Sequence, residues 1–114
     1  MNKITAIVLA AGSGSRMKSK TKKQFMEIKG KPVIWYSLFE FEKSRVDEII
    51  LVTGKEDIDY CKKEIVEKYN LKKIKNVVAG GSERYESVYN GLKEVTGNIV
   101  LIHDGARPLI NNEI

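Results

Sequence analysis

Residues 4–17, ITAIVLAAGSGSRM, decide the fold, because a nearly continuous apolar run leads directly into a loop of small residues with two glycines. Such an unbroken run is typical of a strand buried on both faces, as in a parallel sheet, whereas a half-exposed strand would alternate with polar residues. Gly12 and Gly14 permit a tight turn and the close approach of a ligand to the backbone. The stretch therefore predicts a buried first strand over residues 4–10 that ends in a candidate ligand loop.

Three further apolar runs are separated by segments with helical spacing. The runs cover residues 48–53, 76–79 and 98–103. Helices are expected over residues 33–43, over residues 58–69, and between a Ser82 cap and Gly97. The alternation of strands and helices predicts an α/β fold, a Rossmann-like parallel sheet with helices on both faces and right-handed crossovers.

Two expectations concern how the helices pack. Pro32 suits the first turn of the first helix, where its missing N–H costs nothing. Cys61, in the second helix, is expected to be a small apolar core residue. In the third helix the apolar residues step by three, four and three, which predicts one buried stripe made of Tyr85, Val88, Leu92 and Val95.

The overall composition bounds the class of protein. A chain of 114 residues with 42% hydrophobic and 31% charged residues is expected to form one small soluble domain. The net charge of +5 is spread along the chain with few aromatic residues, which favours a solvated basic surface over a nucleic-acid platform. With one cysteine and no apolar run of membrane or signal-peptide length, a cytoplasmic location is predicted, without membrane contact. Because the chain ends at Ile114, just after a strand and a proline turn, we expect a fragment of a longer protein.

Three unusual segments follow the first, third and fourth predicted strands. They cover residues 10–17, 80–87 and 103–108. Because ligands of open α/β sheets bind beyond the carboxyl ends of the strands, these segments are expected to meet at one site.

The first segment is a candidate phosphate cradle. Ala10, Ala11, Gly12 and Gly14 leave backbone amides accessible to anionic oxygens. The loop is not a Walker A motif, and it is not a dinucleotide fingerprint, since Met17 stands where the third glycine is needed. The glycines alone support a phosphate site and a plain tight turn equally.

Charged residues near these segments add to the case for phosphate chemistry. Arg16 and Lys23 supply positive groups of the kind that stabilise charge during transfer at a phosphate, and Gln24-Phe25 offers an apolar contact that would fix Lys23. Asp104 suits a magnesium ion, and the alternative is a helix cap or an ion pair with Arg107. A structural hydrogen bond is favoured for His103 over general-base work.

The second segment is a candidate base-reading site. Gly80 and Gly81 let a planar ring approach the backbone, and Arg84 and Ser87 offer polar contacts from one helical face. Taken alone, this segment is better explained by an ordinary glycine turn and an exposed helix face.

Together these residues resemble the N-terminal half of the 2-C-methyl-D-erythritol 4-phosphate cytidylyltransferase family. The matching motifs span nearly the whole chain, at residues 10–17, 23–25, 30–32, 80–84, 87–88, 91–92 and 103–108. Gly105 and Lys22 replace a commoner alanine and proline, and neither change removes a functional group. The resemblance implies that residues 1–114 form the CTP-binding part of a single nucleotidyltransferase domain whose C-terminal half is absent.

The resemblance also implies a reaction and roles for individual residues. The phosphate of methylerythritol phosphate would attack the α-phosphorus of CTP and release pyrophosphate, with Mg²⁺ as cofactor. Arg16 and Lys23 match the catalytic pair, and Asp104 matches the metal ligand. The nucleotide-binding positions matched are Ala10, Ala11, Gly12 and Gly14 in the loop, Gly81 and Ser87 at the cytosine, and Ala106 near the ribose. The full-length enzyme is expected to be a homodimer that acts on CTP and a small phosphorylated polyol, and the missing half is expected to leave this chain able to bind nucleotide without turnover.

Four alternatives stay open on the sequence. The nearest is a cytidylyltransferase for pentitol phosphates in cell-wall polymer synthesis, and the next is a nucleotidyltransferase that uses UTP or GTP. Two further alternatives are not enzymes: a non-catalytic nucleotide-binding module and a basic nucleic-acid binder. A nucleic-acid binder would show steeply salt-dependent binding to DNA or RNA.

Overall fold

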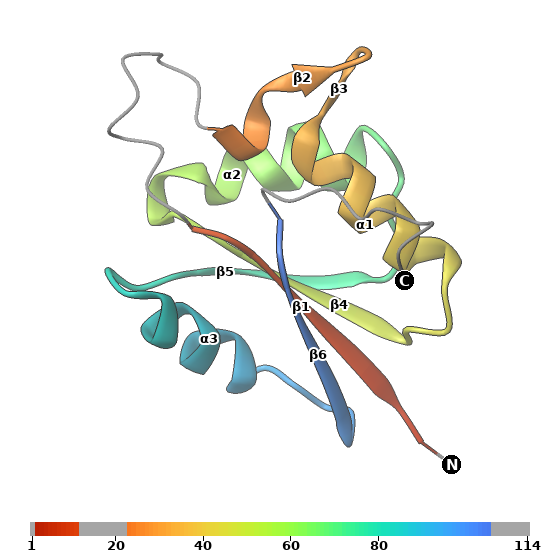
Figure 1. Cartoon of the computed structure of the whole chain (residues 1–114), viewed down its shortest axis with the longest axis vertical. Coiled ribbons are helices and arrows are strands. Elements are labelled where there is room, and N and C mark those ends of the chain that lie inside the picture. The colour runs from red at the N-terminus through yellow and green to blue at the C-terminus, as the bar shows by residue number, and fades with distance from the viewer. Residues whose placement is uncertain (1, 12–22, 106–114) are drawn as a thin grey trace.

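A parallel four-stranded sheet forms the centre of the molecule (Figure 1). The computed structural model describes residues 2–11 and 23–105, and for Lys23 only the backbone. The strands are β1 (Ile4–Ala10), β4 (Glu48–Thr53), β5 (Ile74–Ala79) and β6 (Ile99–Asp104), in the spatial order β5-β4-β1-β6. All three neighbouring pairs are parallel, as the alternating pattern predicted.

Helices cover both faces of this sheet (Figure 1). On one face lie α1 (Val33–Lys43) and α2 (Ile58–Cys61), which continues as a π-helix over Lys62–Glu67, and on the other lies α3 (Arg84–Leu92). Shorter elements are the 3₁₀-helices Lys23–Phe25 and Lys55–Asp57 and the hairpin of β2 (Glu27–Ile28) and β3 (Lys31–Pro32). The predicted Rossmann-like α/β fold is therefore confirmed, and no helix in the described part of the chain is long and apolar enough to cross a membrane.

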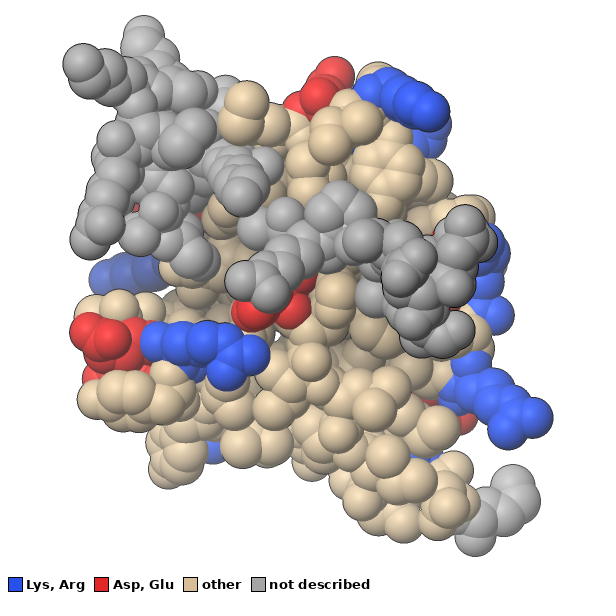
Figure 2. Space-filling model, viewed as in Figure 1, with Lys and Arg blue, Asp and Glu red and all other residues tan. Residues whose placement is uncertain are grey.

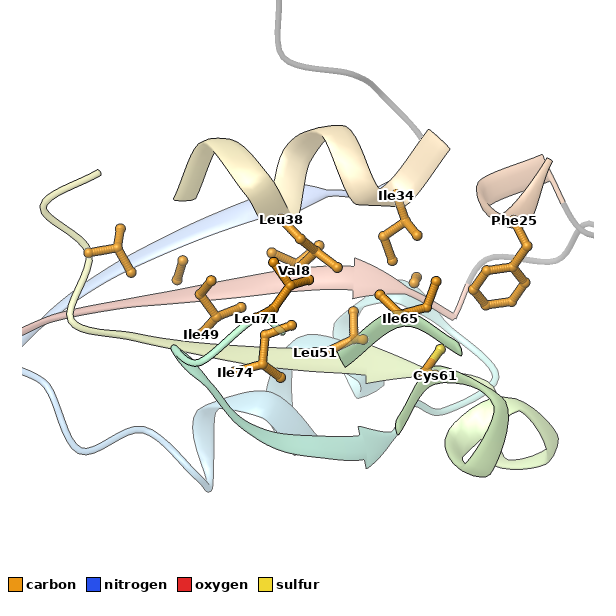
Figure 3. Packing of buried hydrophobic residues seen from close by; sticks show 13 residues of the cluster. Val8, Phe25, Ile34, Leu38, Ile49, Leu51, Cys61, Ile65, Leu71 and Ile74 are labelled. Atoms are coloured by element: carbon orange, nitrogen blue, oxygen red, sulfur yellow. The ribbon is translucent and has the colours of Figure 1, made fainter. Parts of the chain in front are cut away.

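The core divides into two layers because successive side chains of a strand point to opposite faces. Ala6 and Val8 of β1 pack toward α1 and α2, in the cluster that Figure 3 shows. Ile7 and Leu9 pack toward α3. Cys61 is fully buried in the first layer, which confirms its predicted place in the core.

β6 is not buried on both faces, although residues 98–103 form an apolar run. Ile99, Leu101 and Ile102 are 36–43% exposed. The reason is its position, since β6 pairs with β1 on one side and lies at the edge of the described sheet. An apolar run reports a strand's tendency to be buried, whereas the strand order decides which strand lies at the edge.

The predicted stripe on α3 is wrong in part. Tyr85 and Leu92 are exposed, whereas the buried residues of this helix are Ser87 and Gly91. A Cβ at Gly91 would lie 2.9 Å from a methyl group of Ile7, so the helix packs on the sheet through its small residues. Two small residues let the helix approach the sheet more closely than bulky ones would.

The start of α3 differs from the prediction as well. Glu83, not Ser82, precedes its first residue. The carboxylate of Glu86 accepts hydrogen bonds from the backbone N–H groups of Ser82 and Glu83, at 2.8 Å and 3.0 Å. The first turn is thus capped from within the helix by an acidic residue, which also suits the helix dipole.

Candidate functional site

The segments after β1 and β5 meet at the carboxyl edge of the sheet, as the sequence predicted. Gly80 follows β5, and a Cβ placed on it would lie 2.5 Å from both the Ala11 Cβ and the Ser87 Oγ. Real Cβ atoms do not approach other atoms so closely, so only glycine lets the three elements converge here. The turn after β5 is therefore packed directly against the end of β1 and the first turns of α3.

Ser87 holds this glycine turn in place. Its side chain is 4% exposed, and its Oγ accepts a hydrogen bond of 3.1 Å from the backbone N–H of Gly81. The two residues predicted to read the base are thus brought together, with Ser87 acting on Gly81 inside the protein. Their contact with a cytosine ring stays a prediction.

Glu86 belongs to the same turn, and the sequence reasoning missed it. Its Oε1 also accepts a hydrogen bond from the hydroxyl of Ser82 at 2.8 Å. This bond and those from the two backbone N–H groups stabilise the ionised carboxylate and hold the pKa of Glu86 below its usual value. The spacing of Glu83 and Glu86 carried the available signal, since an acidic residue at the third position of a helix marks its N-terminus.

Asp104 and Arg84 join the third segment to the second. Asp104 ends β6 beside Leu9 of β1, and its Oδ1 lies 3.5 Å from the Nε of Arg84 at the start of α3. The side chains are 39% and 62% exposed, so the ion pair contributes about 0–1 kcal/mol and is readily exchanged for another partner. The sequence left an ion pair with Arg107 as one alternative to the metal role of Asp104, and Arg107 lies outside the described residues.

The described residues are compatible with a metal ion that is bound partly by the phosphates of a substrate. Among them no group of three or more His, Cys, Asp or Glu side chains lies together as a dedicated metal cage. Asp104 offers one partly exposed carboxylate at the strand end, and Mg²⁺ commonly binds proteins through one or two carboxylates together with substrate phosphates. The predicted magnesium role of Asp104 is compatible with this arrangement and stays a prediction.

The backbone of Lys23 lies at the same edge, at the start of the 3₁₀-helix Lys23–Phe25. Phe25 is buried in the core and meets the ring of Tyr60 edge-on at 5.1 Å between centroids, which supplies the apolar anchor expected after Lys23. Gln24, which was expected to form an apolar contact together with Phe25, instead makes a polar one: its Nε2 donates to the backbone carbonyl of Ala10 at 2.6 Å. No local pattern identifies this partner, because the two residues lie 14 positions apart.

His103 makes the structural hydrogen bond that the sequence favoured. Its Nε2 lies 2.9 Å from the Oγ of Ser37 on α1, and its ring meets Phe41 edge-on. After it, the backbone N–H of Gly105 donates to the carbonyl of Leu9 at 2.7 Å and closes the turn that follows β6. His103 therefore joins α1 to the sheet.

Four of the predicted site residues lie outside the described residues. They are Gly12, Gly14, Arg16 and Ala106. Their assignments stay predictions, as does the role of the Lys23 side chain.

Charged side chains are dispersed over the described part of one face. On the face shown in Figure 2, the described Lys and Arg side chains lie apart from one another, mostly around the rim, and do not gather into a basic stripe.

Comparisons with known proteins agree with these observations. The family model for 2-C-methyl-D-erythritol 4-phosphate cytidylyltransferase matches residues 4–114. Curated proteins of that name from Lachnoclostridium phytofermentans and Clostridium acetobutylicum are 57% and 55% identical over 111 residues. These alignments cover 96% of the chain and 48% of each relative, so the chain spans about half the length of the curated relatives it matches.

Solved structures give the same result for the fold. The crystal structure of 4-diphosphocytidyl-2C-methyl-D-erythritol synthase from Anaerococcus prevotii matches with a TM-score of 0.76 at 39% identity, covering 95% of this chain and 45% of that one. A Francisella tularensis 2-C-methyl-D-erythritol 4-phosphate cytidylyltransferase matches with a TM-score of 0.70 at 26% identity, covering 96% of this chain and 48% of that one.

Proposed function

Because the chain belongs to the 2-C-methyl-D-erythritol 4-phosphate cytidylyltransferase family, we propose that it carries the nucleotide site of an enzyme that transfers CMP from CTP to 2-C-methyl-D-erythritol 4-phosphate. Pyrophosphate is the second product, and the reaction serves non-mevalonate isoprenoid biosynthesis. The observation that carries the proposal is the convergence at Gly80, where the end of β1, the turn after β5 and the first turns of α3 meet. These elements lie within the residues 4–114 that match the family.

In this proposal the acceptor phosphate attacks the α-phosphorus of CTP. A new phosphorus–oxygen bond forms to the acceptor, and the bond between the α-phosphorus and the bridging oxygen breaks, so that pyrophosphate leaves with the electron pair. The acceptor phosphate is already anionic and needs no general base. Arg16 and Lys23 stabilise the charge that develops on the transferring group, which is the contribution that matters most in such a step.

The described residues supply positioning for the nucleotide. The backbone at Ala10 and Ala11 leads into the phosphate-binding loop, and the turn at Gly81, held by Ser87, offers backbone groups to the cytosine. Asp104 would hold Mg²⁺ together with the nucleotide phosphates. The bound ion would neutralise phosphate charge.

Arg84 takes a role here that differs from simple base reading. Its guanidinium neutralises the carboxylate of Asp104, so a cation that binds Asp104 must compete with it. The low energy of an exposed ion pair makes that exchange easy. Arg84 then becomes available to a nucleotide at the same edge.

The remaining features of the proposed enzyme are its partners and its location. We place it in the cytoplasm, on the basis of a chain with a single cysteine. We further propose a homodimer for the full-length enzyme, by analogy with the family, and no nucleic-acid partner.

The test is turnover by the complete gene product. CTP, UTP, GTP and ATP are titrated in the presence of Mg²⁺, and pyrophosphate release is then measured with methylerythritol phosphate and with a pentitol phosphate as acceptors. Selective binding of CTP with turnover of methylerythritol phosphate supports the proposal. Preference for UTP or GTP, or turnover of the pentitol phosphate alone, overturns it in favour of a related nucleotidyltransferase.

A further inference from the structure

We propose that Gln24 is a positioning residue for Lys23, which it serves by tying the short helix that begins at Lys23 to the carboxyl end of β1. The proposal rests on the proposed function, in which Lys23 stabilises charge during transfer. It adds a residue whose side chain is buried and whose effect is expected on turnover rather than on the affinity for nucleotide.

The contact itself is short and buried. The Gln24 side chain is 3% exposed, and its Nε2 lies 2.6 Å from the carbonyl oxygen of Ala10, which is itself buried at the end of β1. A buried carbonyl without a partner costs about 1–3 kcal/mol, so the site favours an amide donor at this position. Glutamine is otherwise a poor choice for a buried position beside Phe25 in the core.

The bond joins the two ends of the candidate phosphate loop. Ala10 is the last residue of β1 and the first of that loop, and Gln24 follows the loop, 14 residues after Ala10. Within the described part of the chain, this bond is the directional contact that relates the end of β1 to the backbone of Lys23. Both proposed parts of the nucleotide site, the amides after Ala10 and the amine of Lys23, depend on that contact.

The other anchors of the short helix do not replace this bond. Phe25 packs in the core against Tyr60, and the N–H of Val33 donates to the carbonyl of Met26 at 2.8 Å, which joins the segment to α1. Apolar packing resists exposure but is not directional, whereas a hydrogen bond fixes both distance and angle. Among the described contacts, the Gln24 bond is the hydrogen bond that runs from this segment to β1.

The kinetic consequence follows from what Lys23 is proposed to do. A charge that acts on the transition state must be held within a fraction of an ångström, and a displacement of about 1 Å lowers the rate by as much as a hundredfold. Binding of ground-state CTP involves many more contacts and is less sensitive to one of them. Loss of the Gln24 bond is therefore expected to lower kcat more than it raises KM.

The experiment compares three variants of the complete gene product. Gln24→Leu removes the donor with little change of volume, and Gln24→Glu replaces it with a carboxyl group that can donate only when protonated. Thr5→Val is the control at the opposite, amino end of β1, because it removes the buried hydrogen bond that the Thr5 hydroxyl donates to Glu48 at 2.6 Å and the one that it accepts from the N–H of Gly97 at 3.1 Å. Melting temperatures show that each variant is folded under the assay conditions.

We expect Gln24→Leu to lower kcat about tenfold or more with the KM for CTP within about threefold, and Thr5→Val to keep kcat at a similar loss of stability. For Gln24→Glu, kcat relative to the unsubstituted enzyme should recover as the pH is lowered. Equal losses of kcat in Gln24→Leu and Thr5→Val, or a loss confined to KM, would overturn the proposal.

A second measurement separates this proposal from the proposed function. Amide hydrogen exchange over residues 23–26 should be faster in Gln24→Leu and unchanged in Thr5→Val. If the unsubstituted protein shows no cytidylyl transfer, the proposed function fails, and the exchange rates still decide whether Gln24 holds the segment. Unchanged exchange over residues 23–26 in Gln24→Leu would overturn the proposal by itself.

Discussion

Replacing Glu48 by glutamine should destabilise the protein at neutral pH and leave its stability nearly unchanged in acid. Glu48 is buried at the amino end of β4, where its Oε2 accepts hydrogen bonds from the Thr5 hydroxyl at 2.6 Å and from the N–H and hydroxyl of Thr96 at 3.0 Å and 2.8 Å. These contacts join β1, β4 and the turn before β6 at the amino ends of the strands, whereas the candidate site lies at their carboxyl ends.

The magnitude follows from the charge on the acceptor. A hydrogen bond to a charged group contributes about 1.5–3 kcal/mol, against about 0.5–1.5 kcal/mol for a neutral pair. The glutamine oxygen can still accept from the same donors, so each bond loses about 1 kcal/mol, and because bonds to one atom are not additive the expected total is about 2 kcal/mol. Lys3 adds little, since its Nζ lies 3.9 Å away and is half exposed.

The pH dependence has a definite sign. Burial raises the pKa of Glu48, but the hydrogen bonds from Thr5 and Thr96 and the charge of Lys3 outweigh burial, so the pKa lies below its ordinary value of 4.5. A carboxyl whose pKa is lower in the folded state stabilises the protein above the unfolded pKa, and that stability is lost as the pH falls through the folded pKa. The difference between the unsubstituted protein and Glu48→Gln should therefore shrink below pH 4.5.

The assay is urea unfolding of both proteins at pH 7 and at a series of lower values. Asp47→Asn is the control, because that exposed carboxylate accepts a single backbone N–H, from Ile4 at 2.8 Å. A loss below about 0.5 kcal/mol at pH 7, or a difference that persists in acid, would refute the assignment of stability to the charged carboxylate.

Three further substitutions test the candidate site. Gly80→Ala introduces a Cβ 2.5 Å from two neighbouring side chains. It should lower the free energy of unfolding, measured in urea, by about 1–3 kcal/mol and should also weaken the binding of CTP. Unchanged values would contradict the close packing of this turn. Arg84→Gln frees the carboxylate of Asp104 from its ion pair and should raise the affinity for Mn²⁺ by up to about fivefold. The affinity is measured by electron paramagnetic resonance in the presence of CTP. Weaker Mn²⁺ binding would argue against competition between Arg84 and the metal for Asp104. Arg16→Ala should lower turnover by about a hundredfold or more with the fold intact, and normal turnover would remove Arg16 from the proposed catalytic pair.

The local pattern of the chain was sufficient for the sheet and for the edge at which the candidate residues meet. The runs over β1 and β4 predicted both strands to the residue, because a strand buried on both faces requires an unbroken apolar sequence. The order of strands and helices then placed Gly80, Gly81 and Asp104 at the carboxyl edge. Such signals are contained in a few consecutive residues and need no knowledge of distant partners.

Tertiary structure decided which of these residues contact one another. Gln24 donates to Ala10, Arg84 pairs with Asp104, and Ser87 rather than a bulkier neighbour faces the sheet. The same holds for the exposure of β6, which follows from its position at the edge of the described sheet. Strand order and helix crossovers bring together residues that are far apart in the chain, and because hydrophobic periodicity is a local property, it indicates that a face is buried without indicating what that face contacts.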